Sequence, residues 1–356
     1  MLLRSIGWTD RLDSEFHPHR AAGLAPARIA REDRGRYRAL TADGERPAEA
    51  SGRFRHEARA RADFPAVGDW VAVRAAQDGG PCVIEARLPR SSAFVRKAAG
   101  ETTEEQVVAA NVDTVLLVCG LDGDLNPRRI ERFLAAAWES GAAPVVVLNK
   151  ADLAEDPDAR VAEIERVAPG VPVVAVSARS GDRLDALAPW LAPGRTVALL
   201  GSSGVGKSTL VNALLGEARQ ETGDVRADDS RGRHTTTHRE LVPLPGGAVL
   251  VDTPGLRELQ LWADASVLDD AFPDIGALAE RCRFRDCRHA AEPGCAVRAA
   301  AESGALARER LESWRKLQRE LRWLEGKQDV RIRIEEQARW KAISRSMKHH
   351  PKMKRR

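Results

Sequence analysis

The order of two short motifs constrains this chain more than any other feature of its sequence. The first is Asn149-Lys150-Ala151-Asp152, and the second is a glycine-rich segment, 201–208, that ends in Lys207-Ser208. The first pattern is typical of a loop that binds guanine, and the second of a loop that binds phosphate. In an ordinary GTPase domain the phosphate loop comes first. The inverted order therefore predicts a circularly permuted GTPase domain with the nucleotide GTP as its substrate.

The surroundings of the glycine-rich segment favour a phosphate site over a chance turn. Residues 196–200 predict an apolar strand and 207–215 predict a helix, which is the context that such a loop requires. Backbone N–H groups and the helix N-terminus would face the phosphates. Lys207 is expected to reach the β- and γ-phosphates, Ser208 to ligate Mg²⁺, and Thr209 to help at the α-phosphate. The predicted phosphate-binding residues are Gly201, Ser202, Ser203, Gly204, Val205, Gly206, Lys207, Ser208 and Thr209.

A second element of the phosphate site is predicted after the apolar strand 248–251. There the sequence is Asp252-Thr253-Pro254-Gly255. The Asp252 carboxylate, at a strand end, can hold the Mg²⁺ shell, and the Gly255 N–H can sense the γ-phosphate.

The base site is predicted at the ends of two further strands, 145–148 and 171–176. Asp152 can accept two hydrogen bonds from guanine, which adenine cannot donate, so this residue would select GTP over ATP. The stem of Lys150 can cover the base, and Asn149 can tie its loop to the phosphate loop. A backbone N–H of Ser177-Ala178 could donate to guanine O6.

The segment 231–238 lies between the phosphate loop and Asp252 and predicts a switch, although a mobile polar loop fits it as well. Among its threonines, Thr236 is favoured as the residue that closes on Mg²⁺ and the γ-phosphate. Leu256 stands where many GTPases carry a water-orienting glutamine, so basal hydrolysis should be slow, roughly 10⁻⁴ to 10⁻² s⁻¹, and stimulated by a partner. His234 or His238 is the candidate replacement, with surface placement as the alternative. The predicted catalytic residues are His234, Lys207 and Thr236.

The segments that flank the GTPase domain predict a multidomain chain. In residues 1–108, five short alternating runs indicate a small closed β barrel; they are 27–30, 36–41, 52–57, 69–74 and 82–88. This segment is rich in arginine and has no lysine before Lys97, which favours an OB-fold that binds RNA, with a barrel that serves only for docking as the alternative. Residues 109–262 predict a mainly parallel sheet covered by helices on both faces, with strands at 112–118, 145–148, 171–176, 196–200, 241–244 and 248–251 and helices at 127–140, 159–167 and 207–215.

Residues 263–356 predict a mainly α zinc-binding domain with a helix over about 299–324. Cys282, Cys287, His289 and Cys295 supply four zinc ligands within fourteen residues. A set of four protein ligands leaves no position for water, so the predicted role is structural. The alternative is three free thiols and a surface histidine.

Composition indicates where the protein acts and what its C-terminal tail could bind. No run of eighteen apolar residues predicts a membrane helix, and no apolar core near the N-terminus suits a secretory signal, so we expect a cytoplasmic protein. We also expect it to be a monomer. The net charge is only +4, but residues 341–356 hold seven Lys/Arg and no Asp/Glu. That tail suits a polyanion, or is a solvated disordered segment.

Taken together, these motifs resemble the ribosome small subunit-dependent GTPase A family, described as RsgA or YjeQ-like. The resemblance covers about residues 20–325. It implies an OB-fold, a permuted GTPase domain and a zinc domain, in a factor that binds 16S rRNA and acts late in 30S subunit maturation with 30S-stimulated GTPase activity. The rival hypotheses are a GTP-regulated signalling protein, an RNA-binding protein with a vestigial GTP site, and a zinc-dependent nucleic-acid enzyme.

Overall fold

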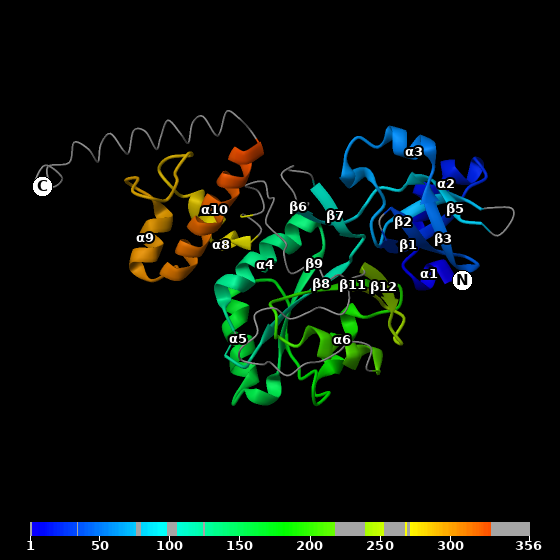
Figure 1. Cartoon of the computed structure of the whole chain (residues 1–356). Coiled ribbons are helices and arrows are strands. Elements are labelled where there is room, and N and C mark those ends of the chain that lie inside the picture. Colours follow the sequence, from blue (N-terminus) through cyan, green and yellow to red (C-terminus); the bar gives the residue numbers. More distant parts are fainter. Residues whose placement is uncertain are drawn as a thin grey trace, which may run out of the picture. The chain divides into compact units, whose positions relative to one another are not determined.

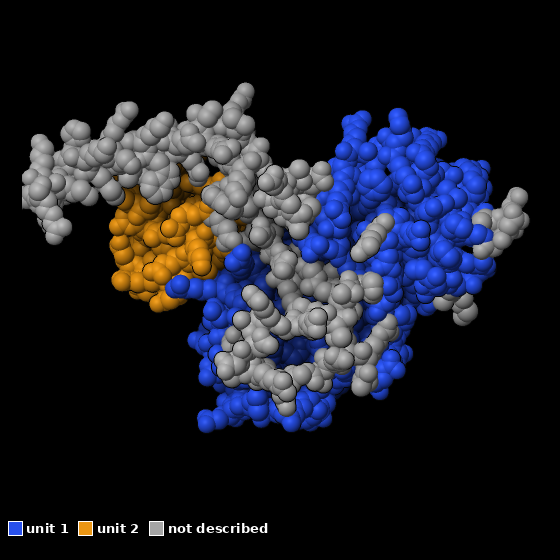
Figure 2. Space-filling view, viewed as in Figure 1, with its two compact units in different colours: residues 1–260 blue, residues 261–356 orange. Residues whose placement is uncertain are grey.

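The computed structural model describes residues 2–33, 35–75, 80–97, 105–123, 125–217, 239–252, 268 and 271–328. The chain divides into two compact units, residues 1–260 and 261–356 (Figure 1, Figure 2). Within the described part of the chain, no helix is both long enough and apolar enough to cross a bilayer.

The first unit begins with a closed five-stranded barrel, as the sequence predicts. Its strands follow the order β1-β2-β3-β5-β4, and the barrel closes because β1 also pairs with β4. The strands are β1 (Ala25–Asp33), β2 (Arg36–Thr41), β3 (Gly44–Ala50), β4 (Trp70–Arg74) and β5 (Cys82–Arg87). Small and branched apolar residues fill its interior, among them Ala27, Ile29, Val71 and Ile84.

The prediction of a strand at 52–57 is wrong, because these residues form helix α3 (Gly52–Glu57). The Ser51 side chain accepts a hydrogen bond from the Phe54 N–H at 3.0 Å, which caps the helix N-terminus. The third barrel strand is instead β3, whose Pro47 and charged residues hide it from a search for apolar alternation. Its stability comes from hydrogen bonding to β2 on one side and to β5 on the other.

Two short helices and a helical turn complete the barrel, and the sequence did not predict them. They are α1 (Leu2–Ser5), α2 (Asp10–Ala21) and the 3₁₀ turn η1 (Arg61–Asp63). Trp8, which lies between α1 and α2, packs edge-on against Phe16 of α2 and against Trp70 of β4. These aromatic contacts pack α2 against β4, on the side of that strand opposite to the barrel interior.

The second part of this unit is a parallel sheet with the strand order β10-β9-β8-β11-β13, and β12 pairs antiparallel to β13. Its strands are β8 (Thr114–Gly120), β9 (Ala143–Asn149), β10 (Val173–Ala175), β11 (Thr196–Leu200), β12 (Arg239–Pro243) and β13 (Val249–Asp252). The strand positions match the predicted runs to within a few residues.

Helices cover both faces of this sheet because its strands are apolar on both sides. They are α4 (Pro127–Ser140), α5 (Pro157–Val167) and α6 (Lys207–Leu215). Alternate residues of β8 point to opposite faces: Val115 and Leu117 join the cluster that contains α4 and α5, and Leu116 and Val118 join the cluster that contains α6. Asn126 and Pro127 begin α4, and the left-handed Gly141 ends it.

The parallel sheet and the barrel are one continuous sheet, because β12 pairs with β13 on one side and with β1 on the other. Glu240 of β12 lies opposite both Asp252 of β13 and Arg31 of β1. A separate hairpin, β6 (Ala93–Lys97) with β7 (Glu105–Ala110), leads from the barrel into β8.

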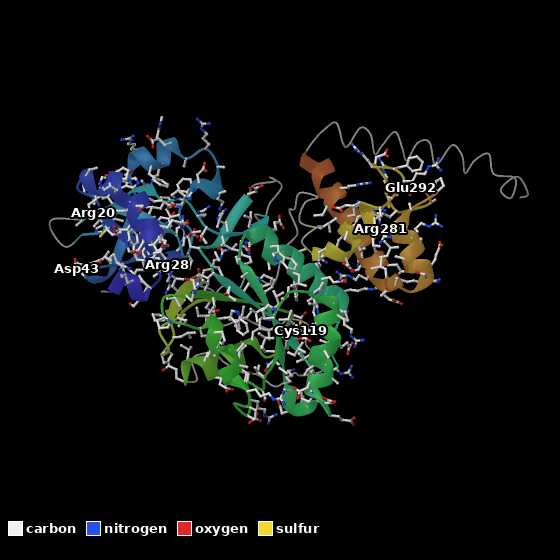
Figure 3. All side chains as sticks on the ribbon, turned by 180° about the vertical axis from the view of Figure 1, so that it is seen from behind. Arg20, Arg28, Asp43, Cys119, Arg281 and Glu292 are labelled. Atoms are coloured by element: carbon white, nitrogen blue, oxygen red, sulfur yellow. The ribbon has the colours of Figure 1, made fainter. Side chains whose placement is uncertain are left out.

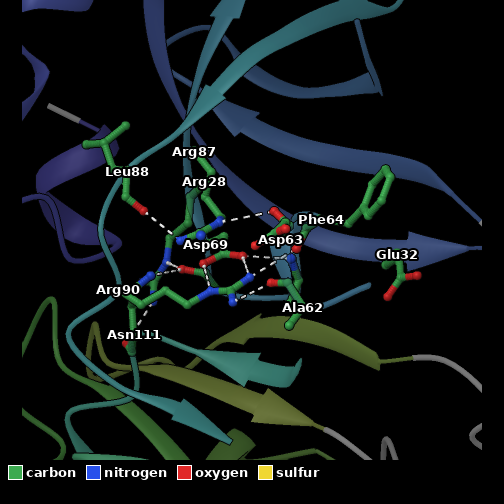
Figure 4. Close-up of polar contacts among 12 residues, drawn as sticks. Arg28, Glu32, Ala62, Asp63, Phe64, Asp69, Arg87, Leu88, Arg90 and Asn111 are labelled. Atoms are coloured by element: carbon green, nitrogen blue, oxygen red, sulfur yellow. Dashed lines mark hydrogen bonds and ion pairs between the residues drawn. The ribbon is translucent and has the colours of Figure 1, made fainter. Parts of the chain in front are cut away.

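The junction between barrel and sheet is built around Arg28, whose side chain is only 1% exposed. Its guanidinium donates to Gly68 O of the barrel at 3.2 Å, to Thr196 Oγ1 of β11 at 2.9 Å, and to the carbonyls of Ile6 and Asn111. Burial lowers the pKa of Arg28 to about 10. Figure 4 shows Arg28 beside Asp69, which accepts two hydrogen bonds from Arg90, and Figure 3 shows Arg28 among all the side chains.

The second unit contains α8 (Pro273–Ala279), α9 (Ala296–Ser303) and α10 (Arg308–Gln328). The single helix predicted over 299–324 is two helices, because Gly304 ends α9 in a left-handed conformation with φ of 81°. Arg310 of α10 makes two hydrogen bonds to Asp274 of α8, at 2.6 and 2.7 Å, and lies over the Phe272 ring.

Candidate nucleotide and metal sites

The candidate nucleotide site lies at the edge where the parallel strands end. From β8 the chain passes through α4 to β9 on one side, whereas from β11 it passes through α6 toward β13 on the other. The strand order thus reverses between β8 and β11. A reversal of this kind opens a crevice at the carboxyl ends of the strands, where open α/β sheets bind ligands.

The predicted phosphate loop follows β11 at this reversal and leads into α6. Two of its glycines are required by close approaches. A Cβ at Gly201 would lie 2.3 Å from Val118 O, and one at Gly206, whose φ is +91°, would lie 2.4 Å from Asn149 Nδ2. The Lys207 ammonium folds over the loop and donates to Gly201 O at 2.7 Å and to Ser202 O. The loop is therefore held tightly, with its lysine above its own backbone.

Asn149 joins three loops of the site. Its side chain is almost fully buried; Nδ2 donates to Val205 O at 2.9 Å, and Oδ1 accepts from the Ala178 N–H at 3.0 Å. The predicted tie between the base loop and the phosphate loop is present. It extends to a third strand end, because Ala178 follows β10.

Lys150 crosses the same edge of the sheet. Its backbone is left-handed, with φ of 64°, and its ammonium donates to Gly204 O at 2.7 Å and pairs with Asp122. Gly120 leaves room for Asp122, the partner of Lys150, because a Cβ there would lie 2.5 Å from Asp122 Oδ1.

Asp122 and Gly120 were not predicted from the sequence. The signal that could have identified them is their position at and just beyond the end of the apolar strand β8, where parallel strands carry functional side chains.

Asp152 is oriented by the next strand end. The Ser177 hydroxyl donates to Asp152 Oδ1 at 2.5 Å. The backbone N–H of Ser177 donates to Asp182 O at 2.9 Å, and that of Ala178 donates to Asn149. In this arrangement the two residues hold Asn149 and Asp152 in place. The predicted donation to guanine O6 would require one of these bonds to give way.

Asp252 ends β13, one strand away from the phosphate loop, with its neighbour Val251 in register with Ala198 of β11. Because β13 is parallel to β11, Asp252 ends its strand at the edge of the sheet from which the phosphate loop leads to Ser208 in α6. Thr209 lies in the first turn of α6. The other predicted residues, His234, Thr236, His238, Gly255 and Leu256, fall outside the described residues.

The candidate metal site lies in the second unit. The ligand atoms of Cys282, Cys287, His289 and Cys295 all lie within 4.8 Å of one another. The Cys282 and Cys295 sulfurs are 3.9 Å apart, and His289 Nδ1 lies 3.6 Å from the first and 3.4 Å from the second. Zinc–sulfur bonds of about 2.3 Å place tetrahedral sulfur ligands about 3.8 Å apart. Both the donor set and its spacing fit a zinc ion.

The surroundings of these ligands shift their pKa values in different directions. Desolvation, together with the neighbouring thiols Cys295 and Cys282, raises the pKa of Cys287 to about 11. For Cys282, desolvation is outweighed by backbone N–H groups of Val297 and Ala296 at the start of α9, so its pKa is lowered. Desolvation lowers the pKa of His289, which keeps the imidazole neutral and able to ligate a metal. A bound cation would stabilise the thiolates that otherwise repel one another.

The fold and the nucleotide site define a class, the circularly permuted P-loop GTPases. Comparison with known proteins gives the family. The family model described as RsgA GTPase matches residues 87–262. A model described as ABC transporter matches residues 184–348, a range that contains the phosphate loop but not the motif at 149–152.

Comparison with individual proteins extends the similarity to most of the chain. A protein of Opitutus terrae named small ribosomal subunit biogenesis GTPase RsgA is 53% identical over 96% of both chains. The crystal structure of YjeQ from Thermotoga maritima has a TM-score of 0.65 and 29% identity, and it covers 84% of this chain and 98% of that one. The structure of YloQ, described as a circularly permuted GTPase, has a TM-score of 0.60 and 25% identity, with coverage of 84% and 95%. The chain belongs to the RsgA GTPase family and is a GTP hydrolase.

Proposed function

We propose that this GTPase binds the small ribosomal subunit late in its maturation and hydrolyses GTP to GDP and phosphate in response to that subunit. One observation carries the proposal: the similarity to a protein named for small-subunit biogenesis extends over 96% of both chains and therefore includes the flanking modules as well as the GTPase domain. A signalling GTPase would need the nucleotide site but neither the barrel nor the Cys/His cluster.

The residues at the carboxyl ends of the parallel strands would make the contacts to the nucleotide. Residues 201–209 would hold the phosphates, and Asp152 would recognise guanine through its carboxylate, positioned by Ser177. Lys150 would cover the base, and Lys207 would turn from its loop carbonyls to the β- and γ-phosphates. Ser208, Thr236 and Asp252 would hold Mg²⁺, which neutralises phosphate charge when bound.

Slow intrinsic hydrolysis follows from Leu256. A leucine has no polar atom with which to orient water, so the isolated protein lacks the glutamine that many GTPases use. We assign His234 as the residue that the subunit would bring to the water, with Thr236 closing on the γ-phosphate.

The continuous sheet supplies a route from nucleotide to barrel. Strand β12 begins at Arg239, directly after the proposed switch in the sequence. Its residue Glu240 lies opposite Asp252 of β13 on one side and opposite Arg31 of β1, a barrel strand, on the other. A switch that moves the start of β12 therefore acts directly on a barrel strand. We infer that the barrel senses the nucleotide state in this way.

We further propose that the barrel and the Cys/His module contact 16S rRNA. The metal module would hold one structural Zn²⁺ through Cys282, Cys287, His289 and Cys295. Between and beside these ligands it exposes Phe284 and four arginines, a combination suited to bases and phosphates; the arginines are Arg281, Arg283, Arg285 and Arg288. The protein would act as a cytoplasmic monomer.

The direct test is GTP turnover titrated with purified 30S, 50S and 70S particles. We expect strong stimulation by 30S subunits and little by the other two. Equal turnover with all three particles, or rapid turnover by the protein alone, would contradict the proposal and favour a GTPase that does not act on the ribosome.

A further inference from the structure

Three arginines converge on one amide where the barrel, the β6–β7 hairpin and β12 meet. They are Arg61 of η1, Arg96 of β6 and Arg239 of β12, and the amide is that of Gln106 in β7, which is 7% exposed. These elements are far apart in the sequence, and Arg239 is the first described residue after the proposed switch. This set, called the three-arginine cluster below, has no part in the nucleotide site.

One amide cannot satisfy all three guanidinium groups. In one orientation the Gln106 oxygen accepts from Nε and Nη2 of Arg96, both at 3.4 Å. With the amide turned over, the oxygen accepts instead from Arg61 Nη2 at 3.1 Å and from Arg239 Nη1 at 3.2 Å. Because the amide has a single oxygen, at least one guanidinium group lacks this acceptor in either orientation.

The charge of the cluster is also unbalanced. Among the residues that the structure describes, Glu32 of β1 is the one carboxylate within ion-pair distance of the cluster, 4.0 Å from Arg239 Nη1. Burial lowers the pKa of Arg239, the positive charges of Arg96 and Arg61 lower it further, and Glu32 opposes them. Three positive charges thus share one negative partner in a partly desolvated setting.

Solvent reaches the cluster. Arg61 is exposed, Arg96 is half-buried, and the Arg239 side chain retains 15% of its exposure. A ligand can therefore enter from the side of η1 and meet donors from the barrel, the hairpin and β12 together.

We propose that the three-arginine cluster is a binding site for a phosphate group. Guanidinium forks match the oxygens of phosphate better than any other side chain does. Such a ligand supplies the acceptors that Gln106 cannot, and it offsets the excess positive charge. The ligand is either a phosphodiester of an RNA backbone or free inorganic phosphate, which hydrolysis of GTP releases. The RNA alternative rests on the proposed function, whereas the phosphate site itself does not.

The proposed phosphate site lies where the barrel meets β12. A phosphate group held by Arg61, Arg96 and Arg239 bridges the barrel to the strand that follows the switch. If the phosphate belongs to RNA, contact with RNA restrains the start of β12 directly.

The test compares two double variants of the full-length protein. Arg61→Gln/Arg96→Gln removes two charges from the cluster and leaves Arg239 in place. Arg53→Gln/Arg74→Gln removes two exposed barrel arginines that pair with Glu57 and Glu85 and serves as the matched control. Both variants should bind GDP like the wild type. The cluster variant should also keep its unfolding temperature, because it relieves repulsion.

The first arm measures affinity for 30S subunits, with a non-hydrolysable GTP analogue bound, across a range of salt concentrations. We expect the cluster variant to bind about tenfold more weakly than the control, with a slope of log K against log salt that is shallower by about 1. This result assigns the ligand to an RNA phosphodiester.

The second arm measures binding of radiolabelled inorganic phosphate to the GDP-loaded protein by equilibrium dialysis, without ribosomes. Loss of binding in the cluster variant alone, by about tenfold or more, assigns the ligand to free phosphate. If the wild type fails to bind 30S subunits selectively, the proposed function fails, and this arm alone decides the site. Indistinguishable behaviour of the two double variants in both arms overturns the proposal.

Discussion

Replacing Arg28 by methionine tests how the barrel is fixed to the GTPase sheet. Methionine fills a similar volume but donates no hydrogen bond. The Gly68 carbonyl keeps a partner, because the Asn111 side chain also donates to it at 3.1 Å. The carbonyls of Ile6 and Asn111 and the hydroxyl of Thr196 each lose the guanidinium.

The expected loss of stability follows from these contacts. A buried acceptor left unpaired costs about 1–3 kcal/mol, so three such acceptors cost about 6 kcal/mol at mid-range. Burial lowers the pKa of Arg28 to about 10, well below its ordinary value; at about 1.36 kcal/mol per pKa unit, methionine therefore avoids a desolvation penalty of about 3 kcal/mol. The net loss in the free energy of unfolding is about 3 kcal/mol, which lowers Tm by about 6–12 °C.

Urea and thermal unfolding followed by circular dichroism would measure the change. The matched control is Arg38→Met on the neighbouring strand β2, where an exposed arginine pairs with Glu45 and should contribute less than about 1 kcal/mol. A double-mutant cycle with Thr196→Val should show coupling of about 1 kcal/mol across the junction. If Arg28→Met costs no more than Arg38→Met, the buried network does not fix the barrel to the sheet.

Three further outcomes are expected. Asp152→Asn should weaken GDP binding about 100-fold or more and favour xanthosine diphosphate, in which a carbonyl replaces the guanine amino group; an unchanged base preference in competition binding would contradict the assigned role. Tyr37 is the single tyrosine of the chain, and burial raises its pKa to about 12. Its contribution to stability should persist below pH 10 and disappear as pH rises toward 12, and tyrosinate absorbance with a midpoint near 10 in the folded protein would refute its burial. Chelation should release one zinc ion per chain and reduce helicity, as should Cys282→Ser, while GDP binding by residues 1–260 persists; full helicity without metal would argue against a structural ion.

The sequence predicted the parts of the fold that local pattern determines. Strand β11 and helices α4 and α6 lie where periodicity placed them, because buried strands and capped helices carry their signal within a few residues. Strand β3 was not predicted, because it is stabilised by hydrogen bonds to β2 and β5 and its own residues carry no strand pattern. A weak alternating pattern suggested a strand where α3 lies. The residues form a helix instead because the Ser51 cap outweighs that pattern.

The candidate nucleotide site was predictable to the extent that it follows sequence motifs. The bond from Asn149 to Val205 lies between two recognised loops, so the prediction could name it. Asp122 belongs to no such motif, and only the pairing of β8 with β9 brings it to Lys150. The pairing of β12 with the barrel strand β1 could not be predicted either, because these strands lie about 200 residues apart in the sequence.

In the proposed mechanism, the nucleotide state reaches the barrel and sets its affinity for the small ribosomal subunit. Equilibrium binding of the full-length protein to purified 30S subunits, with either a non-hydrolysable GTP analogue or GDP, tests it most directly. We expect binding at least about tenfold tighter with the GTP analogue. Equal affinity in the two nucleotide states would contradict it.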